Sequence, residues 1–328
     1  MLEPEIIKYA YQRIKPYIHN TPLLQSSHLN DWLGHEIIFK LEPFQKIGAF
    51  KIRGALNTVL SLKEQGDLPA ELVTFSSGNH AQAVALAGKM FGIKTTVFMT
   101  KTSSKTKRQA TEDYGAKVII TEDRKEAEAR AMEMKNRAYF IHPFDNDMVI
   151  AGQGTACYEA LQTGINPAAI FATCGGGGLL SGTFLAKQLI SPKSLVFAGE
   201  PAEADDATRS YNSGKIISYE NSPKTIADGA VSLSVSIRTF NYLKQLNGFY
   251  TVSEEEIIYW TQWLTHLLKV SIEPTAAVAM GAAFKWLQAQ KSKQKILVIL
   301  SGGNISPETY RTIWEKDCLD KVPTLSLV

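Results

Sequence analysis

The chain has 328 residues, of which 45% are hydrophobic and 20% charged, a composition that excludes an intrinsically disordered chain and a collagen-like repeat. Its 35 basic and 32 acidic residues are mostly interspersed and leave a formal charge of +3, so we expect no extended surface for nucleic acid or an anionic membrane. No stretch of the sequence approaches the roughly 18 uninterrupted apolar residues of a membrane span.

Apolar runs rich in β-branched residues alternate with helical periodicities along the whole chain. The sequence predicts helices over 3–18, 49–64, 77–91, 105–114, 124–137, 150–161, 179–189, 252–268 and 275–290. It predicts strands over 36–41, 72–75, 95–99, 117–121, 170–174, 195–199 and 296–300. This alternation is typical of an α/β fold built on open parallel sheets.

The cysteines and the N-terminal segment indicate where such a chain would reside. Cys157, Cys174 and Cys318 have neither the CxxC nor the Cys/His spacing of a disulfide framework or a zinc site. Residues 1–18 are amphipathic and carry glutamates where a secretory signal would have an apolar run. We therefore expect a reduced, cytoplasmic setting.

The first candidate functional segment is FQKIGAFKIRGA, residues 44–55. Its lysine, Lys51, lies between two glycines at the start of a predicted helix. A lysine that is partly buried behind Phe50 loses its proton more readily and can form a Schiff base. The alternative is an ordinary solvated lysine.

The second segment is SSGNHAQA, residues 76–83, at the junction of a strand and a helix. Hydroxyl, amide and imidazole groups beside free helix-terminal amides favour an anion site suited to a carboxylate. In the alternative interpretation, Ser76 or Ser77 caps the helix and His80 is a surface histidine.

Two further segments follow predicted strands. CGGGGLLSG, residues 174–182, has four consecutive glycines whose backbone amides can close on a phosphate. It lacks the lysine of a P-loop and the GxGxxG spacing of a dinucleotide fold. In SGGN, residues 301–304, Ser301 can hydrogen-bond a neutral ring nitrogen, or the segment can be an ordinary turn.

In this order the four segments resemble the pyridoxal-5′-phosphate (PLP) enzymes of the threonine dehydratase and serine racemase family. The resemblance extends to HPF…VIAGQGT at 142–155, TIADG at 225–229 and EPTAA at 273–277. It implies the tryptophan-synthase-β-like fold (PLP fold type II), with two open, mostly parallel sheets flanked by helices. Residues 1–65 and 147–328 would form a large PLP-binding domain, and residues 66–146 a small inserted one.

The resemblance also implies which residues bind the cofactor. Lys51 would form the internal aldimine and accept the α-proton on one face of the substrate. Phe50 would pack beside the PLP ring, Asn79 would bond its phenolic oxygen, and Ser301 would face its pyridine nitrogen. The phosphate would be held by four glycines: Gly175, Gly176, Gly177 and Gly178.

The same resemblance implies the substrate contacts and the choice of reaction. The substrate would be bound by Ser76, Ser77, Asn79, His80 and Ser232. Ser77 stands where serine racemases have the serine that exchanges a proton on the face opposite the lysine. Hydroxyaspartate dehydratases also carry this serine, so the residue permits racemisation and does not establish it. The sequence KIGAFK, where racemases usually have KTGSFK, leans towards the dehydratases.

GEPAEADD, residues 199–206, is similar to the metal loop of serine racemases. The resemblance implies that the carboxylates of Glu200 and Asp206 and the carbonyl of Ala204 bind Mg²⁺ or Ca²⁺. These are hard oxygen ligands of the kind that such cations prefer. The alternative for an acidic run of this kind is a solvated face.

The implied function is PLP-dependent dehydration and deamination of L-serine or L-threonine to a 2-oxo acid and ammonia, through an aldimine on Lys51. The alternatives are a serine racemase or bifunctional enzyme that uses Lys51 and Ser77, and a 3-hydroxyaspartate dehydratase. A PLP-binding protein without turnover and a β-replacement enzyme such as cysteine synthase are rivals from other classes.

Further expectations concern partners and effectors. The family implies a homodimer that acts on a small hydroxy amino acid. The sequence ends soon after the SGGN segment, so we expect no regulatory domain of the isoleucine-sensitive type. Gln82 and Tyr114 match only part of the nucleotide site of eukaryotic serine racemase. Arg124 and Arg130 are both offset from the position of its carboxylate-binding arginine.

Overall fold

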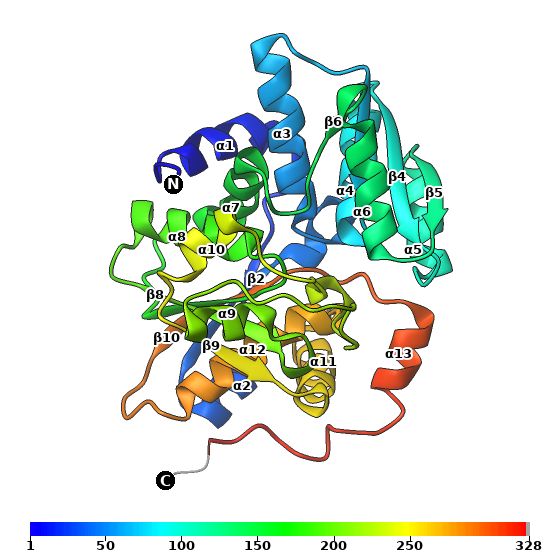
Figure 1. Ribbon diagram of the computed structural model, residues 1–328. Helices are drawn as coiled ribbons and strands as arrows, with labels where there is room; N and C mark the ends of the chain where they lie inside the picture. The colour runs from blue at the N-terminus through cyan, green and yellow to red at the C-terminus, as the bar shows by residue number, and fades with distance from the viewer. Residues whose placement is uncertain (326–328) are drawn as a thin grey trace.

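The structure is a computed structural model that describes residues 1–325, and it contains two separate β-sheets (Figure 1). The strands are β1 (Leu23–Leu24), β2 (Glu36–Leu41), β3 (Glu71–Phe75), β4 (Lys94–Thr100), β5 (Lys117–Thr121), β6 (Tyr139–Phe140), β7 (Ala169–Thr173), β8 (Leu195–Pro201), β9 (Gly248–Val252) and β10 (Lys295–Leu300). The helices are α1 (Ile6–Ile14), α2 (Ser27–Leu33), α3 (Lys51–Gln65), α4 (Asn79–Met90), α5 (Lys105–Asp113), α6 (Arg124–Glu133), α7 (Asp147–Leu161), α8 (Gly178–Ile190), α9 (Asp206–Ser213), α10 (Ile237–Leu243), α11 (Glu254–Leu268), α12 (Pro274–Leu287) and α13 (Pro307–Ile313).

The larger sheet has the strand order β1-β2-β10-β7-β8-β9. All its pairs are parallel except β1 with β2, and β10 runs between β2 and β7, with Ile296 opposite Ile37 on β2. Its central strands are apolar on both faces because helices cover both of them. Val298 packs with α11 and α12 on one face, whereas Leu297 packs with α7 and α8 on the other.

The smaller sheet has the order β5-β4-β3-β6 and is parallel throughout. Val97 of β4 packs with Ala81 and Ala85 of α4 on one face. Phe98 packs with Ala127 of α6 on the other. This sheet stands at the right of Figure 1, and α3 connects it to the larger sheet by packing against both α4 and α7.

The α/β class and the two mostly parallel sheets predicted from the sequence are confirmed. The strands of the smaller sheet all lie between residues 71 and 140, and those of the larger sheet lie outside this range. Among residues 1–325, no helix combines the length and apolar character that crossing a membrane requires.

The structure shifts the ends of most predicted elements by a few residues and adds several elements. The helix expected from residue 252 begins at Glu254, because Ser253 and Glu256 form a capping box there, and Val252 instead ends β9. The unpredicted elements are β1, β6, β9, α2, α9, α10 and α13. Apart from the five-residue β9, they are two-residue strands or helices of seven or eight residues, too short for periodicity to reveal.

Candidate active site

The candidate segments meet because three of them follow the carboxyl ends of parallel strands, where α/β sheets present ligand groups. They come after β3, β7 and β10. Ala49 forms a backbone bridge with Gly302, and the amide of Phe50 donates to the carbonyl of Ser301 at 3.0 Å. The side-chain amide of Asn304 donates to Asn79 Oδ1 at 2.8 Å. The lysine, SSGN and SGGN segments therefore form one site.

Lys51 is the first residue of α3, and its environment favours a neutral amine. Its Nζ donates to the carbonyl oxygen of Pro143 at 3.0 Å and lies 5.1 Å from the centre of the Phe50 ring. Burial lowers the pKa of Lys51 to about 7; the charge of Arg124 acts in the same direction and Glu273 opposes it. A substantial fraction of this amine is unprotonated at neutral pH, as a Schiff-base lysine requires.

The turn before Lys51 is held in an unusual backbone conformation. Ile47 and Gly48 both have positive φ, at 63° and 70°. A Cβ on Gly48 would lie 2.6 Å from Asn304 Oδ1, so only glycine fits there. The turn is thereby locked against the SGGN segment, and it directs the chain into α3 at Lys51.

A buried ionic network supports the same helix two residues further on. Arg53 is fully buried and forms hydrogen-bonded ion pairs with Glu42, at 2.7 Å, and Glu159, at 3.2 Å. Lys40 also pairs with Glu159. Because β2, α3 and α7 all contribute to this network, it fixes the first turn of α3 against the larger sheet.

The four glycines of residues 175–178 form a cradle that side chains would fill. Gly177 has a φ of 87° and is the N-cap residue of α8. A Cβ on Gly176 would lie 2.0 Å from the Phe144 ring, and one on Gly178 would lie 2.5 Å from Gln153 Oε1. Backbone amides at the start of a 13-residue helix, without a side-chain cap, suit a phosphate group.

In the SSGN turn neither serine caps α4, contrary to the alternative interpretation of the sequence. The N-cap residue is Gly78, and no side chain caps the helix. Ser76 Oγ instead accepts from the amide of Gly78 at 3.2 Å, and Ser77 Oγ lies 3.1 Å from Thr100 Oγ1. The first amides of α4 are left available for an anionic ligand.

His80 is not the surface histidine of that alternative, because it is only 2% exposed. Its Nε2 is 3.0 Å from the carbonyl oxygen of Ile141, and its Nδ1 is buried without a partner among the described residues. Burial, with the charge of Lys51, holds its pKa well below the ordinary value. The imidazole is therefore neutral and turned towards Ile141, so its backbone amide is the group best placed to meet an anion.

Glu273 belongs to the site although the sequence did not single it out as a functional residue. Its two carboxylate oxygens accept from Asn79 Nδ2 at 3.1 and 3.0 Å, and Ser301 Oγ donates to Oε1 at 3.5 Å. Burial raises its pKa to about 7. The sequence signal that could have pointed to Glu273 is its place in EPTAA, directly before the proline that starts α12.

Comparison with known proteins identifies the cofactor chemistry. A family model described as "Pyridoxal-phosphate dependent enzyme" matches residues 14–302. The chain belongs to this family. An L-threo-3-hydroxyaspartate ammonia-lyase of Saccharomyces cerevisiae is 40% identical over 93% of this chain and 94% of its own. A serine racemase of Dictyostelium discoideum is 40% identical over 91% of this chain and 94% of its own.

Solved structures agree with this assignment. A threonine deaminase from T.th. superposes with a TM-score of 0.86 and is 39% identical over 93% of this chain and 99% of its own. A PLP-dependent aspartate racemase gives a TM-score of 0.88 at 31% identity, over 94% of this chain and 97% of its own. The chain is thus a fold-type II PLP enzyme, and the predicted family is confirmed.

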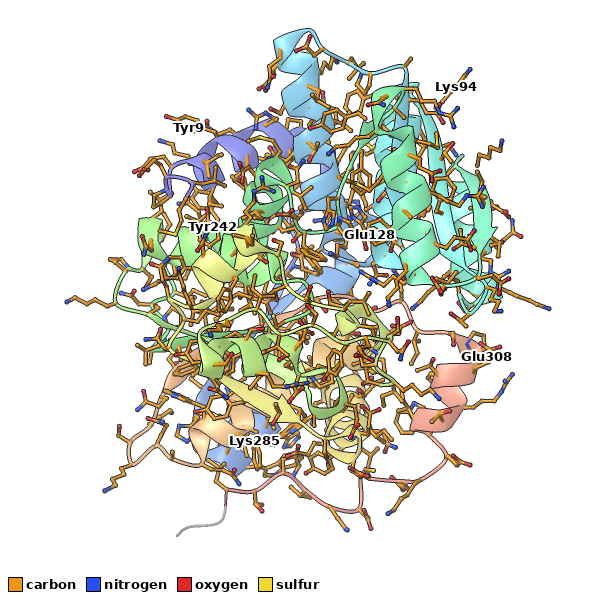
Figure 2. The ribbon with its side chains drawn as sticks, viewed as in Figure 1. Tyr9, Lys94, Glu128, Tyr242, Lys285 and Glu308 are labelled. Atoms are coloured by element: carbon orange, nitrogen blue, oxygen red, sulfur yellow. The ribbon has the colours of Figure 1, made fainter. Side chains whose placement is uncertain are left out.

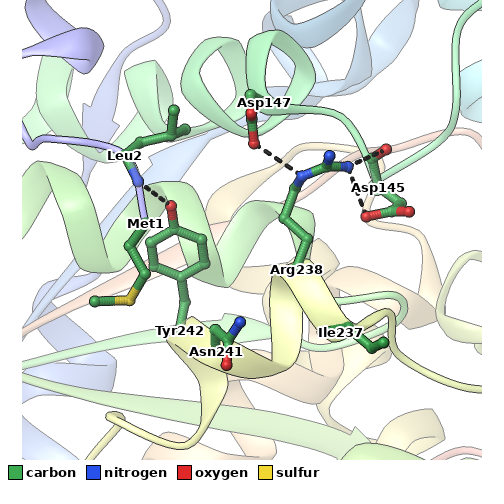
Figure 3. Close-up of a pocket in the computed structure, with 8 residues that line it drawn as sticks. All are labelled: Met1, Leu2, Asp145, Asp147, Ile237, Arg238, Asn241 and Tyr242. Carbon is green, nitrogen blue, oxygen red and sulfur yellow. Dashed lines mark hydrogen bonds and ion pairs between the residues drawn. The ribbon is translucent and has the colours of Figure 1, made fainter.

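In this PLP enzyme the loop that accepts the Lys51 hydrogen bond is clamped from α10 (Figure 3). Arg238 donates to the carbonyl and carboxylate oxygens of Asp145, at 2.7 and 2.8 Å, and to Asp147 at 2.9 Å. His142 Nδ1 accepts from the amide of Asp145 at 2.8 Å. These contacts hold the loop between β6 and α7, which carries Pro143 and the phenylalanine that covers the glycine cradle.

The predicted metal ligands are close together and buried. Both carboxylate oxygens of Asp206 lack a hydrogen-bond partner within the described part of the chain. Burial and the charge of Asp206 raise the pKa of Glu200 to about 8. Burial raises the pKa of Asp206 to about 7. Residues 1–325 contain no cluster of three His, Cys, Asp or Glu side chains suited to a metal.

Two observations complete the placement of the predicted residues. Ser232 is buried, and its hydroxyl donates to the carbonyl of Ser234 at 3.0 Å, so this contact does not join it to the SSGN turn. Figure 2 shows Glu128 on α6 and Lys94 at the start of β4, where the Lys94 side chain points outwards. Arg124, the first residue of α6, lies close enough to Lys51 for its charge to lower the pKa of that amine.

Proposed function

We propose that the chain is a PLP-dependent ammonia-lyase that converts L-serine and L-threonine into a 2-oxo acid and ammonia. The observation that carries this proposal is the amine of Lys51, with a pKa of about 7, which donates to the carbonyl of Pro143 in the loop that also packs Phe144 against the glycine cradle. PLP, when bound, supplies an electron sink for the electrons left on the substrate Cα.

The residues around that sink have separate tasks. Gly175, Gly176, Gly177 and Gly178 would hold the phosphate through backbone amides. Phe50 would contact the ring, and Asn79 and Ser301 would bond its two polar edges. Lys51 would bind the cofactor covalently and, as a free amine, accept the α-proton. Ser76, Asn79 and the amide of His80 would orient the substrate carboxylate, and Ser232 is proposed as a further substrate contact.

Serine racemisation is a second candidate, and one observation favours it. Ser77 Oγ lies 3.1 Å from Thr100 Oγ1, which in turn lies 2.9 Å from Thr102 Oγ1 and 3.2 Å from Ser103 Oγ. This chain of hydroxyls gives Ser77 a route for a proton. A tenfold preference between elimination and reprotonation corresponds to only about 1.4 kcal/mol of barrier, so one hydroxyl can decide the partition.

Dehydration of 3-hydroxyaspartate is a third candidate, because the second carboxylate of that substrate would lie near the cation of Arg124. The guanidinium of Arg124 lies 5.3 Å from the ring centre of Phe75, the residue before Ser76. Its charge lowers the pKa of Lys51 and His80, so it lies close to the site. The yeast relative named above also carries the hydroxyaspartate activity in its name.

We further propose a Mg²⁺ or Ca²⁺ ion held by Glu200, Asp206 and the carbonyl of Ala204. The unpartnered oxygens of Asp206 and the raised pKa values of both carboxyls support it, since a cation would relieve both. We also propose a cytoplasmic homodimer in which residues 66–146 form a domain that closes on substrate.

The test is incubation of PLP-loaded protein with L-serine, L-threonine and L-threo-3-hydroxyaspartate, with Mg²⁺ or with a chelator. The 2-oxo acid and D-serine are quantified together. We expect 2-oxo acid from L-serine or L-threonine as the main product, and none from Lys51→Ala. D-serine formed at a comparable rate and lost in Ser77→Ala would establish the racemase instead. A strong preference for hydroxyaspartate would establish the third candidate.

A further inference from the structure

Glu273 is a buried carboxyl that connects the two side chains proposed to hold opposite edges of the PLP ring. It lies at the N-cap of α12 and is 2% exposed. Its amide donates to the carbonyl of Gly302 at 3.1 Å, and a Cβ on Gly302 would approach Glu273 Oε1 to 2.6 Å. The carboxyl is therefore wedged between the SSGN and SGGN segments.

The hydrogen-bond donors around this carboxyl can be assigned. Asn304 Nδ2 donates to the carbonyl of Ile47 at 2.6 Å and to Asn79 Oδ1 at 2.8 Å, which fixes the orientation of Asn79. Asn79 must then present its NH₂ group to Glu273. The hydroxyl of Ser301 donates to Glu273 Oε1 at 3.5 Å, so the lone pairs of that hydroxyl remain free for another donor.

The charges near Glu273 come from three elements. Lys107 of α5 lowers its pKa and Asp228 raises it, and these two residues form an ion pair with each other. Lys51 of α3 also interacts with it electrostatically. Burial, the largest influence, raises the pKa of Glu273 to about 7, so the carboxyl exchanges its proton in the neutral range.

We propose that Glu273 is a positioning residue that shares one proton with the ring nitrogen of PLP through the hydroxyl of Ser301. The inference rests on the proposed function, because it takes Ser301 as the residue that faces this nitrogen. In one arrangement the proton is on Glu273, which donates to Ser301, and Ser301 donates to a neutral nitrogen. In the other the nitrogen is protonated and donates to Ser301, and Ser301 donates to the carboxylate. The proton number is the same in both.

The consequence concerns the strength of the cofactor as an electron sink. A serine alone cannot stabilise a protonated ring nitrogen, but a carboxylate one hydroxyl away can do so by its charge. Protonation of the nitrogen strengthens the sink and lengthens the life of the deprotonated substrate. Glu273 would thereby favour reprotonation relative to the loss of hydroxide.

The test follows the ring nitrogen directly, in holoenzyme loaded with ¹⁵N-labelled PLP and titrated between about pH 6 and 9, the range that brackets an acid titrating near neutrality. The wild-type ¹⁵N shift should move towards the protonated value as the pH falls, with a neutral midpoint. Glu273→Gln should stay at the unprotonated value throughout, because the charge is gone. The matched control Glu71→Gln, at a carboxylate that accepts from Thr96 in the smaller sheet, should titrate as wild type.

Two further variants keep the test decisive where Glu273→Gln fails to fold. Asp228→Asn should lower the midpoint, because it removes a negative charge, and Lys107→Met should raise it. The inference would be overturned if the ¹⁵N shift titrated in Glu273→Gln as it does in the wild type, or if the midpoint moved in neither charge variant. Such a result would leave the proposed function standing if 2-oxo acid were still produced. If the wild-type protein did not bind PLP at all, the proposed function would be overturned, and this inference with it.

Discussion

The amine of Lys51 lies 3.0 Å from the carbonyl oxygen of Pro143, 92 residues away in the chain. This contact joins the first turn of α3 to the loop between β6 and α7. The same loop places Phe144 against Gly176 and Gly178. The reactive amine and the phosphate cradle are thus held by one short segment.

Replacing Lys51 by arginine should abolish covalent cofactor binding, because a guanidinium stays protonated and cannot form a Schiff base. Turnover should fall by at least about 10²-fold, the lower range for loss of a general base. Borohydride reduction followed by mass spectrometry measures the covalent adduct. The control Lys46→Arg, at a lysine of the same turn, should retain both the covalent adduct and turnover. An adduct that persisted in Lys51→Arg would assign the Schiff base to another residue.

Gly176→Ala should weaken PLP binding, because the new Cβ would lie 2.0 Å from the Phe144 ring. We expect the dissociation constant to rise at least about tenfold, equivalent to roughly 1.4 kcal/mol. Fluorescence titration with PLP gives the value. Gly92→Ala is the control: Gly92 also has special geometry, with a φ of 67°, but nothing lies within 4 Å of its Cβ position. That change should cost about 1 kcal/mol of stability and leave PLP affinity intact.

The stability of the metal-free protein should depend on pH through Glu200 and Asp206. Their pKa values are raised from 4.5 to about 8 and from 3.8 to about 7. The folded chain therefore holds protons that the unfolded chain has lost, and the free energy of unfolding falls as the pH rises through this interval. Mg²⁺ should raise the melting temperature more at pH 8 than at pH 6, the two ends of the neutral range in which these carboxyls ionise.

Asp206→Asn should remove this Mg²⁺ effect, whereas Glu203→Gln, at an exposed neighbour, should keep it. Scanning calorimetry at both pH values makes the comparison. Equal melting temperatures with Mg²⁺ and with a chelator would contradict the proposed cation site.

Arg53→Met should destabilise the fold more than any surface charge substitution. It leaves the buried carboxylates of Glu42 and Glu159 with less compensation, and breaking such a pair typically costs about 3–5 kcal/mol. Urea unfolding measures the loss. In Lys101→Met only an exposed pair with Glu122 is removed, so the loss should be far smaller. Similar losses in both variants would show that burial does not set the cost.

Arg238→Met should loosen the clamped loop without unfolding the protein. Arg238, Asp145 and Asp147 are each about two-fifths exposed at the side chain, so the ion pairs add little stability. We expect a decrease in kcat of a few fold, because the loop positions the acceptor of the Lys51 hydrogen bond. Stopped-flow and steady-state kinetics test this, with Arg311→Met on α13 as the control. A change in KM alone would mean that the loop contacts substrate and does not position Lys51.

The sequence by itself determined the elements whose signal is local. Strands β2 and β5 have the predicted bounds, since each is a short apolar or β-branched run between turn residues. The glycine run after β7 likewise predicted a phosphate cradle, and the lysine in a glycine-flanked turn predicted a reactive amine. Both predictions were possible because backbone freedom and the position of a helix terminus depend on residues that are neighbours in the sequence.

Only the tertiary structure decided the contacts that tune these groups. Glu273 and Asn79 are 194 residues apart, and nothing local to either indicates that they share a hydrogen bond. The neutral state of His80 and the low pKa of Lys51 depend on burial and on charges from other elements. Desolvation and long-range Coulomb interactions arise only when distant segments pack together, so residue type and spacing could name the reactive groups but not set their protonation.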